Sequence, residues 1–355
     1  MRAGDLTRRL QQVVGLSPIA APVAGYRLAR VNRAAALTSA WDRIAGYYFQ
    51  RRVFLELLER SCDFNQRYYE LRDAGGTLVG GAVLCTLRVD VLTYLGIRSP
   101  LDIDFVAIPC SQPAPGLLGA PEMQRCTLER VVLEEPGFLV GLNLDHPLDL
   151  PPVVETSTLP AVVLDRSFAS FDDYLWALRS PYRRRLKQIM ASFAGVVIER
   201  GPCSRFDDEM YRLYRSVLAR SSAKLETLTQ SFFQQLPPEF ALTSYRRDGR
   251  LIAWHISLLD GDRFYFFLEG HEPETEPNLY FNILAGVLRE AFERHASAIE
   301  LGQTAEVPKM RLGGRLAPKG MFGTHPSRGV RAALRLGRPL LGYSRRVPTT
   351  HVFHA

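Results

Sequence analysis

The most regular pattern of apolar positions in this 355-residue chain lies in its last third. Apolar residues recur there at three- and four-residue spacing, which predicts a helix with one buried face. These residues are Leu279, Ile283, Leu284, Val287, Leu288, Ala291 and Phe292. The helix is predicted to end near His295, and the sequence from Ala298 to Leu301 predicts a short strand after it.

A glycine-rich basic turn follows this strand. Gly302, Gln303 and Thr304 come first, and Lys309 and Arg311 add two cations shortly afterwards. Donor groups at the end of a strand can hold a polar or anionic ligand. The alternative is an ordinary helix-to-strand connection whose basic side chains are solvated.

The second half of the chain predicts helices followed by a β-meander. Residues 171–192 have the spacing of one or two helices, 196–199 that of a strand, and 207–219 that of an amphipathic helix. A shorter helix is predicted to begin near Leu228. Three strands then follow, over 241–245, 251–259 and 264–268, with turns at Arg247-Asp248-Gly249 and Asp260-Gly261-Asp262.

The first half shows a similar order of elements. A helix is predicted over 53–60, and Asp73-Ala74-Gly75-Gly76 indicates a hairpin between strands at 68–72 and 78–84. Further strands are predicted at 89–94, 104–108 and 130–133, with a surface loop over 109–121. The matching order suggests a tandem repeat of one α+β unit.

These patterns divide the chain into four parts. Residues 1–38 are expected to form a flexible basic lead-in, 39–164 an N-terminal domain, 165–320 a C-terminal domain that carries the active site, and 321–355 a basic tail. The segment 153–164 is predicted to cross between the domains. Only the second domain has the Gly302-Gln303-Thr304 to Lys309 segment, so one active centre is expected.

The net charge of +7 is concentrated at the two ends of the chain. Residues 1–37 contain six arginines against Asp5, and residues 309–355 contain ten lysines or arginines and no acidic residue. The remainder is therefore net negative, which does not favour a basic groove along the body. The basic ends can contact tRNA, a membrane surface or an acidic partner, or they can be solvated.

Several classes of protein are disfavoured by missing patterns. No run of about 18 apolar residues and no secretory signal is present, so we expect a cytoplasmic protein without a transmembrane segment. The sequence lacks a phosphate-binding loop, a dinucleotide fingerprint, a His-Glu-x-x-His motif and a Gly-x-Ser-x-Gly elbow. Kinases, dehydrogenases, zincins and esterases are therefore disfavoured.

Two blocks of sequence resemble a known superfamily. The first contains Tyr280, Asn282, Leu301-Gly302-Gln303-Thr304, Lys309 and Leu312-Gly313-Gly314. The second pairs the aromatic-rich 171–175 with the basic 180–187. Together they resemble the GNAT-like acyltransferases that include the CelD and FemAB-type proteins. The resemblance implies an α+β fold of tandem GNAT-like domains, each a mixed, mostly antiparallel sheet flanked by helices.

Acyl transfer to an amine, as the resemblance implies, needs a base for the amine proton and donors for the developing oxyanion. Glu269 and His255 are the candidate catalytic bases, although a histidine on a β-meander is often structural. The predicted substrate-binding residues are Lys309, Arg311, Gln303, Thr304, Tyr280, Asn282, Tyr182 and Arg183. No metal site is expected.

The acyl donor is left open by the sequence. Acetyl-CoA-dependent members of the superfamily commonly carry a Gln/Arg-x-x-Gly-x-Gly/Ala loop before the long helix, whereas this chain has residues 271–277 there, with three glutamates that repel a diphosphate. Acyl-CoA and aminoacyl-tRNA both remain possible co-substrates, with no tightly bound cofactor. The basic helix around Arg183 offers charge for RNA phosphates.

The acceptor is expected to be an amine of an envelope, polysaccharide or small-molecule substrate. A third alternative is a catalytically inactive binding or scaffold module. A pocket lined by Glu269, Lys309 and Arg311 would favour an enzyme, whereas a site filled by Tyr280 or Phe281 would favour a scaffold.

Overall fold

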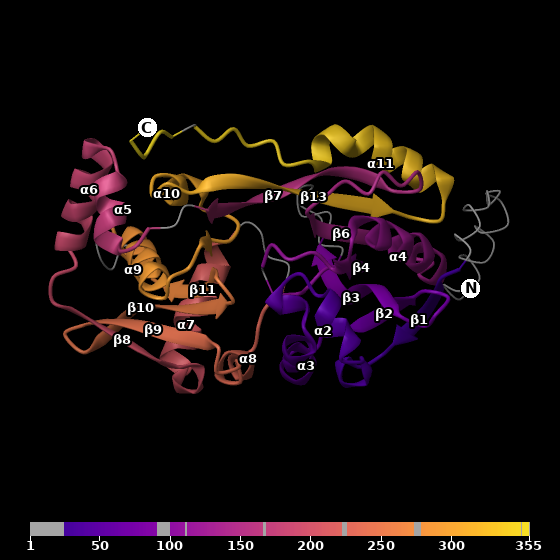
Figure 1. Ribbon diagram of the computed structural model, residues 1–355, viewed down its shortest axis with the longest axis horizontal. Helices are drawn as coiled ribbons and strands as arrows, with labels where there is room; N and C mark the ends of the chain where they lie inside the picture. Colours follow the sequence, from indigo (N-terminus) through magenta and orange to yellow (C-terminus); the bar gives the residue numbers. More distant parts are fainter. Residues whose placement is uncertain are drawn as a thin grey trace. The chain divides into compact units, whose positions relative to one another are not determined.

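A computed structural model describes residues 25–90, 100–110, 112–165, 168–221, 226–272, 278–348 and 350–354. The chain forms two compact units, whose elements are labelled in Figure 1. The first unit contains residues 1–109, 114–159 and 318–344, and the second contains 110–113, 160–317 and 345–355. Strand β7 (Val154–Leu164) runs from the first unit into the second, and β13 (Arg315–Thr324) returns.

The first unit is a mixed, mostly antiparallel sheet with helices. Its strands follow the order β1, β2, β3, β4, β6 and the end of β13, with β5 beside β3. Strands β4 and β6 are parallel, whereas the pairs β1–β2, β2–β3, β3–β4 and β6–β13 are antiparallel. The elements are β1 (Arg27–Val31), η1 (Ala34–Ala36), α2 (Ala40–Ile44), η2 (Tyr48–Gln50), α3 (Arg52–Ser61), β2 (Arg67–Arg72), β3 (Leu78–Asp90), β4 (Pro100–Val106), β5 (Leu117–Gly119), α4 (Pro121–Glu134), β6 (Leu139–Leu144) and α11 (Arg328–Leu341).

The core of the first unit forms where α4 packs on the sheet. Leu128 and Val131 of α4 are fully buried in one cluster with Phe322 of β13. A Cβ atom at Gly141 of β6 would lie 1.9 Å from the ring of Phe322. Glycine is therefore required at this position, because it lets the returning strand β13 place an aromatic ring in the core.

The second unit is built around a β-meander. Its strands follow the order β7, β12, β11, β10, β9 and β8, and β11 pairs with β12 in parallel while the other pairs are antiparallel. The elements are α5 (Phe171–Ala177), α6 (Ser180–Ala191), β8 (Val196–Pro202), η4 (Cys203–Arg205), α7 (Asp208–Arg220), α8 (Gln230–Gln234), β9 (Phe240–Arg247), β10 (Arg250–Asp260), β11 (Arg263–His271), α9 (Leu279–Glu293), β12 (Ala298–Glu300) and α10 (Glu306–Met310). The expected α+β fold of tandem GNAT-like domains is confirmed in its architecture.

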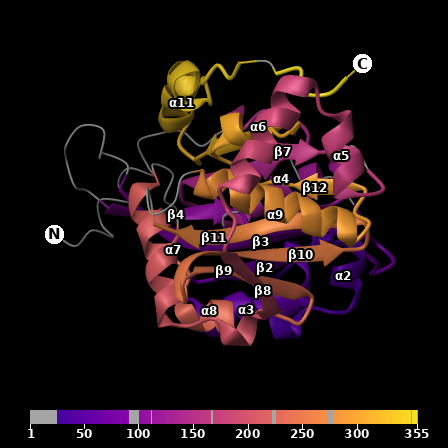
Figure 2. The same cartoon turned by 90° about the vertical axis from the view of Figure 1, so that its left-hand side faces the viewer.

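Helices α7 and α9 cover opposite faces of the meander (Figure 2). The alternation of strand side chains places Trp254 and His255 on opposite faces. The indole Nε1 of Trp254 donates to the carbonyl of Met210 on α7 at 2.8 Å, and His255 lies beside Glu290 of α9. The apolar stripe that predicted α9 is buried in the core of this unit.

Two local expectations were wrong. Residues 130–133 belong to helix α4 and form no strand. The segment 109–121 contains strand β5, and Gln112 within it is only 2% exposed, so the segment is not a surface loop. Short apolar pieces there were read as strand or loop because their burial depends on contacts distant in sequence.

The C-terminal part of the chain is structured. Residues 318–344 belong to the first unit and include α11, whereas residues 345–355 belong to the second unit. In the second unit the amide of Arg179 donates to the carbonyl of Val352 at 2.9 Å, and Phe353 forms a β-bridge with Leu178. The sequence-based division had assigned 321–355 to a tail. Of the expected lead-in, residues 1–24 lie outside the described residues, and β1 lies at its end.

Across the described parts of the chain, every helix is too short or too polar to cross a lipid bilayer.

Packing of α9 on the meander predicts an unusual response at Gly286. Alanine in place of a helical glycine normally stabilises a protein by about 1 kcal/mol. Here a Cβ atom would lie 2.5 Å from the hydroxyl of Tyr245, so we expect Gly286→Ala to lower the free energy of unfolding by about 1–3 kcal/mol. Urea denaturation of the purified protein measures this change.

A double-mutant cycle identifies the cause. Tyr245→Phe removes the hydroxyl, so Gly286→Ala should be neutral or stabilising in that background. An equal loss of stability with and without the Tyr245 hydroxyl would contradict the packing described here.

Candidate functional site

The turn between β12 and α10 is held by one buried lysine. Gly302, Thr304 and Ala305 all have positive φ angles, of 74°, 58° and 46°. Lys309 on α10 is 3% exposed, and its Nζ donates to the carbonyls of Gln303 at 2.7 Å and Thr304 at 2.9 Å. Because non-glycine residues rarely adopt this backbone conformation, the lysine stabilises a strained turn from inside.

Burial and two nearby carboxylates have opposite effects on the pKa of this lysine. Burial lowers the pKa of Lys309 to about 8, while Glu269 and Glu306 act in the opposite direction. Glu306 is buried on the first turn of α10, and its Oε2 lies 3.1 Å from Nη1 of Arg345. The amine is therefore partly neutral near pH 8, which is unusual for a lysine.

Glu269 lies near the end of β11, and one of its carboxylate oxygens lacks a hydrogen-bond donor among the described residues. Its Oε2 is buried and accepts no hydrogen bond from the described residues, and it lies 3.6 Å from Nδ1 of His271. The His271 nitrogen is also buried without a hydrogen bond among these residues. Buried polar atoms in native proteins are nearly always hydrogen-bonded, so this pair is suited to a ligand or an ordered water.

Tyr280 lies beside these groups, and together with Glu269, His271, Glu306 and Lys309 it forms a cluster of polar side chains. Tyr280 is in the first turn of α9, and its ring stacks on His271 with centroids 6.1 Å apart. Burial, with smaller effects from Glu269 and Glu306, raises the pKa of Tyr280 well above its usual value. The phenol therefore stays protonated and can donate a hydrogen bond.

The structure thus brings together five residues that the sequence singled out, namely Glu269, Tyr280, Gln303, Thr304 and Lys309. Sequence reasoning did not identify His271 and Glu306 as members of the site. His271 is two residues after Glu269 on a strand, and Glu306 is three residues before Lys309 on a helix, so periodicity places each beside a residue that was predicted.

His255 lies directly opposite Glu269 in the register of β10 and β11. It is 1% exposed, with Nδ1 3.1 Å from the hydroxyl of Tyr245 and Nε2 3.5 Å from Oε2 of Glu290. Burial alone would raise the pKa of Glu290, but its contacts with His255 and Ser257 keep it below its usual value. His255 is thus part of a buried network beneath α9.

The other four predicted residues are engaged elsewhere on the second unit. The Asn282 amide donates to the carbonyl of Ile189 at 3.2 Å and so joins α9 to α6. Tyr182 packs against the apolar core, and Arg311 is exposed. Nη1 of Arg183 donates to the carbonyl of Trp176 at 3.1 Å, and its guanidinium lies 5.0 Å from the centroid of that ring.

The edge of β11 beside the cluster is only partly paired. Its parallel pairing with β12 ends at Tyr265 opposite Glu300, although β11 continues to His271. Beyond that point the carbonyl of Phe267 accepts a hydrogen bond from the Gln112 side chain at 2.7 Å. Among the described residues no strand pairs with this edge beyond Tyr265, and an extended ligand can add to such an edge.

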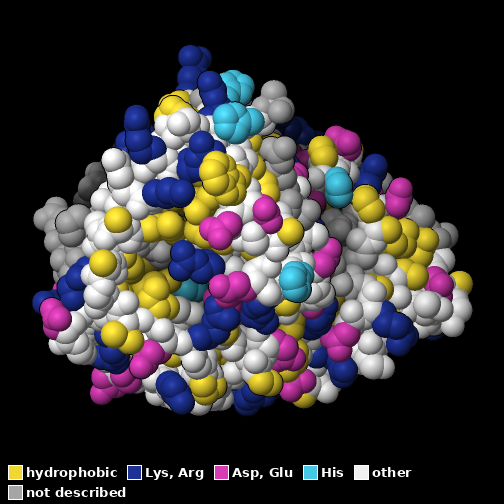
Figure 3. Space-filling view, turned by 60° about the vertical axis from the view of Figure 1, so that its left-hand side comes forward, with side chains coloured by type: hydrophobic (Ala, Val, Ile, Leu, Met, Phe, Trp, Pro, Cys, Tyr) yellow, Lys and Arg dark blue, Asp and Glu magenta, His cyan; other side chains and the backbone are white. Residues whose placement is uncertain are grey.

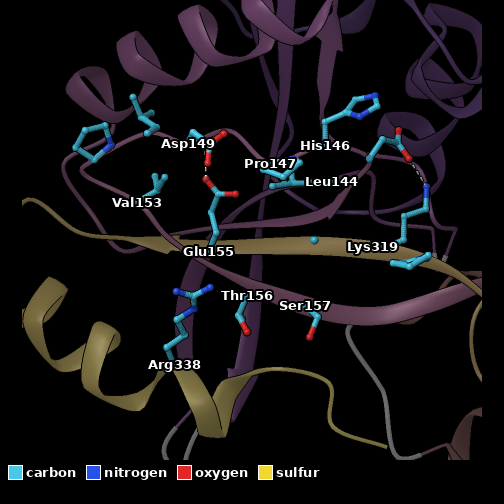
Figure 4. Close-up of a pocket in the computed structure, with 15 residues that line it drawn as sticks. Leu144, His146, Pro147, Asp149, Val153, Glu155, Thr156, Ser157, Lys319 and Arg338 are labelled. Carbon is cyan, nitrogen blue, oxygen red and sulfur yellow. Dashed lines mark hydrogen bonds and ion pairs between the residues drawn. The ribbon is translucent and has the colours of Figure 1, made fainter. Parts of the chain in front are cut away.

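A hollow of about 930 Å³ lies within the first unit, away from the residues selected from the sequence (Figure 4). Its acidic groups already have partners, because Glu155 accepts from the amides of Leu148 and Asp149 at 3.1 and 2.9 Å. Nζ of Lys319 lies 2.6 Å from Oδ1 of Asp145. Glu155, Asp145 and Lys319 are thus already engaged, and none of the residues of this hollow had been selected from the sequence.

Charge on the surface of the described residues is mixed. Cationic and acidic side chains are interspersed over the face shown in Figure 3 and form no single basic field there. The observation agrees with the charge distribution in the sequence, in which the body of the chain is net negative.

Comparisons with known proteins support this fold. The family model for the acetyltransferase (GNAT) domain matches residues 177–310. A comparison with curated proteins finds no similar sequence.

Solved structures share the architecture at low sequence identity. The crystal structure of FemX has a TM-score of 0.57 and 10% identity, with 86% of this chain and 100% of that chain covered. The structure of L-PGS from Bacillus licheniformis has a TM-score of 0.51 and 10% identity, covering 81% and 96%. A tandem GNAT protein from the clavulanic acid biosynthesis pathway has a TM-score of 0.50 and 13% identity, covering 84% and 98%.

At this level of identity the likeness concerns the fold, and it extends over both units of the chain. The domain match covers β8 to β12 and most of the residues described above, including Glu269, Tyr280 and Lys309. The chain therefore has a tandem GNAT-like fold, and its second unit contains the match to the GNAT domain model.

Proposed function

We propose that this protein is an N-acyltransferase that moves an acyl group from an acyl-CoA donor to an amine of an envelope, polysaccharide or small-molecule acceptor. The observation that carries this proposal is the cluster of Glu269, Tyr280 and Lys309 beside the partly paired edge of β11. The cluster lies inside the segment that matches the GNAT domain, in a family of acyltransferases.

Glu269 is the proposed general base. An amine attacks only as its neutral form and loses a proton as the new bond forms, so a base such as a carboxylate is needed to take up that proton. The Oε2 atom of Glu269 has no hydrogen bond from the described residues and is therefore available for that proton. The amine nitrogen then bonds to the thioester carbonyl carbon, the carbon–sulfur bond breaks, and the thiolate leaves.

Tyr280 is the proposed hydrogen-bond donor to the reacting oxygen or to the departing thiolate. Its raised pKa keeps the phenol protonated at neutral pH. A neutral donor held in a buried site stabilises developing negative charge more strongly than the same donor in water. The proton that the thiolate takes up balances the one that leaves the amine.

Lys309 is proposed as a positioning residue. Both hydrogen bonds of its Nζ go to backbone carbonyls of the turn. Those bonds fix the path of the chain from Gly302 to Ala305, next to the end of β11. The amides that a fixed turn presents can then bind a donor without reordering.

The partly paired edge of β11 is the proposed binding surface for the acyl donor. An extended donor with amide groups can add to an exposed strand edge through backbone hydrogen bonds. The tandem GNAT protein from the clavulanic acid biosynthesis pathway, whose structure was solved without AcCoA, shares the fold. This likeness favours an acyl-CoA thioester as the first donor to test.

Aminoacyl-tRNA is the second candidate donor, and one observation favours it. Trp176 is 68% exposed, and Arg183 and Lys187 lie 5.0 and 5.8 Å from the centroid of its ring. Exposed aromatic rings next to cations bind single-stranded nucleic acid by stacking and charge. The exposed Arg184 and Arg185 add charge to the same helix.

A donor assay tests the proposal. Purified protein is incubated separately with labelled acetyl-CoA and with tRNA charged with labelled amino acid, each with a mixture of amines. We expect transfer of label only from acetyl-CoA. Transfer from tRNA alone would replace the proposed donor, and transfer from neither by folded protein would favour a binding module.

Glu269→Gln tests the base in the same assay. We expect kcat to fall by about 10²- to 10⁴-fold with little change in KM for the donor, because the amide cannot accept the proton. Glu272→Gln is the matched control, since Glu272 pairs with Arg212 on the surface and should keep nearly full activity. Equal activity in both variants would exclude Glu269 as the base.

The lowered pKa of Lys309 predicts a pH-dependent stability. Between pH 8 and 10.5 the unfolded chain binds the Lys309 proton more strongly than the folded chain. The free energy of unfolding of wild type, relative to Lys309→Met, should therefore rise through this range as the burial penalty of the charged amine disappears.

Urea denaturation at pH 7, 8, 9 and 10 measures this difference. Lys187→Met, at an exposed lysine, is the control and should show a constant difference from wild type across the same range. A Lys309→Met difference that is equally constant would show that the amine is not affected by burial.

A further inference from the structure

Helix α11 of the first unit presents its apolar side chains to solvent. No residue of α11 is buried, and Leu336 and Leu340 are 84% and 90% exposed. These two leucines are four residues apart and lie on the same face of the helix. A surface helix normally turns such a stripe toward the protein, so the arrangement is inverted.

The opposite face of α11 makes the contacts with its own unit. Nη1 of Arg331 donates to the carbonyls of His325 and Pro326 at 2.7 and 2.8 Å, and Nη2 of Arg335 donates to the carbonyl of Pro151 at 2.9 Å. Leu334, on the same side, packs near Gly323 of β13. These contacts fix the rotation of the helix about its axis and hold Leu336 and Leu340 outward.

The end of the helix is also fixed. The amide of Tyr343 donates to the carbonyl of Ser157 at 3.0 Å, and the Ser157 hydroxyl donates to the carbonyl of Tyr343. The outward leucines are therefore not an effect of a loose terminus. Figure 1 shows α11 at the rim of its unit.

Charge on and around α11 has one sign. The helix contains Arg328, Arg331, Arg335 and Arg338 and no acidic residue, and no acidic residue occurs anywhere from Lys309 to Ala355. Arg328 is exposed, and Arg338 is exposed while also lining the hollow of the first unit. A partner that binds this surface must therefore accept apolar side chains and also supply negative charge.

An anionic phospholipid surface meets both requirements. Leucines of a basic amphipathic helix enter the boundary between headgroups and acyl chains, while the arginines bind the headgroups. Nucleic acid would use the arginines but not the leucines. A second copy of α11 would use the leucines but would bring eight arginines together without an acidic residue on either helix.

We propose that α11 is an interfacial membrane anchor that binds an anionic phospholipid surface through Leu336 and Leu340, with positive charge from the exposed Arg328 at the start of the same helix. The helix has 14 residues and lies in the plane of the interface. This proposal is independent of the acyl-transfer reaction. It places the protein at a membrane, whichever amine it acylates.

Vesicle sedimentation of the full-length protein tests the anchor. Wild type should bind vesicles that contain about one-third phosphatidylglycerol and should bind pure phosphatidylcholine vesicles far more weakly, with binding reduced by added salt. The double variant Leu336→Gln, Leu340→Gln should bind the anionic vesicles at least about tenfold more weakly. A wild type that does not bind anionic vesicles at low ionic strength overturns the proposal.

A matched control separates the helix from general hydrophobicity. Leu101 and Leu133 are 50% and 45% exposed on other elements of the first unit, so Leu101→Gln, Leu133→Gln should bind vesicles as wild type does. Equal loss of binding in the control and the α11 variant would overturn the assignment to α11. Circular dichroism of each variant verifies that it is folded.

Two further measurements distinguish a phospholipid surface from a second copy of the chain and from RNA. If wild type is a dimer without lipid and the leucine variant is a monomer by analytical ultracentrifugation, α11 binds a second copy and the proposal is overturned. Leu340→Trp gives a depth signal, because its fluorescence should shift to the blue on anionic vesicles. A shift on adding RNA in place of vesicles would also overturn the proposal.

Discussion

The hydrogen bonds from Nζ of Lys309 to the carbonyls of Gln303 and Thr304 are the interaction on which the candidate site depends. Three residues of positive φ follow β12, and two of them are not glycine. Each of the two non-glycine residues, Thr304 and Ala305, costs about 1 kcal/mol or more, so the turn persists only if other contacts hold it. The buried lysine supplies those contacts at the same time as it gives the cluster a cation.

The cluster therefore combines strain with incomplete hydrogen bonding. The turn is fixed by Lys309, Tyr280 is kept protonated, and Glu269 and His271 each have a buried atom without a hydrogen bond among the described residues. The Tyr245, His255 and Glu290 network beneath α9 also contains such atoms, because Nε2 of His255 and Oε2 of Glu290 lie 3.5 Å apart without a hydrogen bond among the described residues. Unsatisfied polar groups at the edge of a partly paired strand are typical of a site that completes its bonding with a ligand.

Local periodicity predicted the elements whose burial is regular. Helix α9, the hairpin of β2 and β3 and the opposite faces of Trp254 and His255 follow from spacing alone. Residues 130–133 were misread because β-branched residues also occur in helices. Helix α11 was missed because its apolar stripe is not buried, so the pattern of a basic segment suggested a tail.

The chemistry of the site was predictable only in part. The sequence indicated Glu269, Tyr280 and Lys309, but the resemblance also suggested Asn282, Tyr182 and Arg183, whose interactions join helices or pack in the core. Whether a polar side chain bonds to backbone or faces a ligand depends on the elements packed around it. A lysine that looked like a ligand contact is buried on carbonyls of its own turn, which no spacing rule reveals.

Hydrogen exchange with a non-reactive acyl-CoA analogue tests the central assignment most directly. If the edge of β11 binds the donor, amides at 268–271 and 301–305 should exchange more slowly when the analogue is bound, since both segments border the cluster. Protection confined to residues 144–157 and 318–320, which line the hollow in the first unit, would contradict the account.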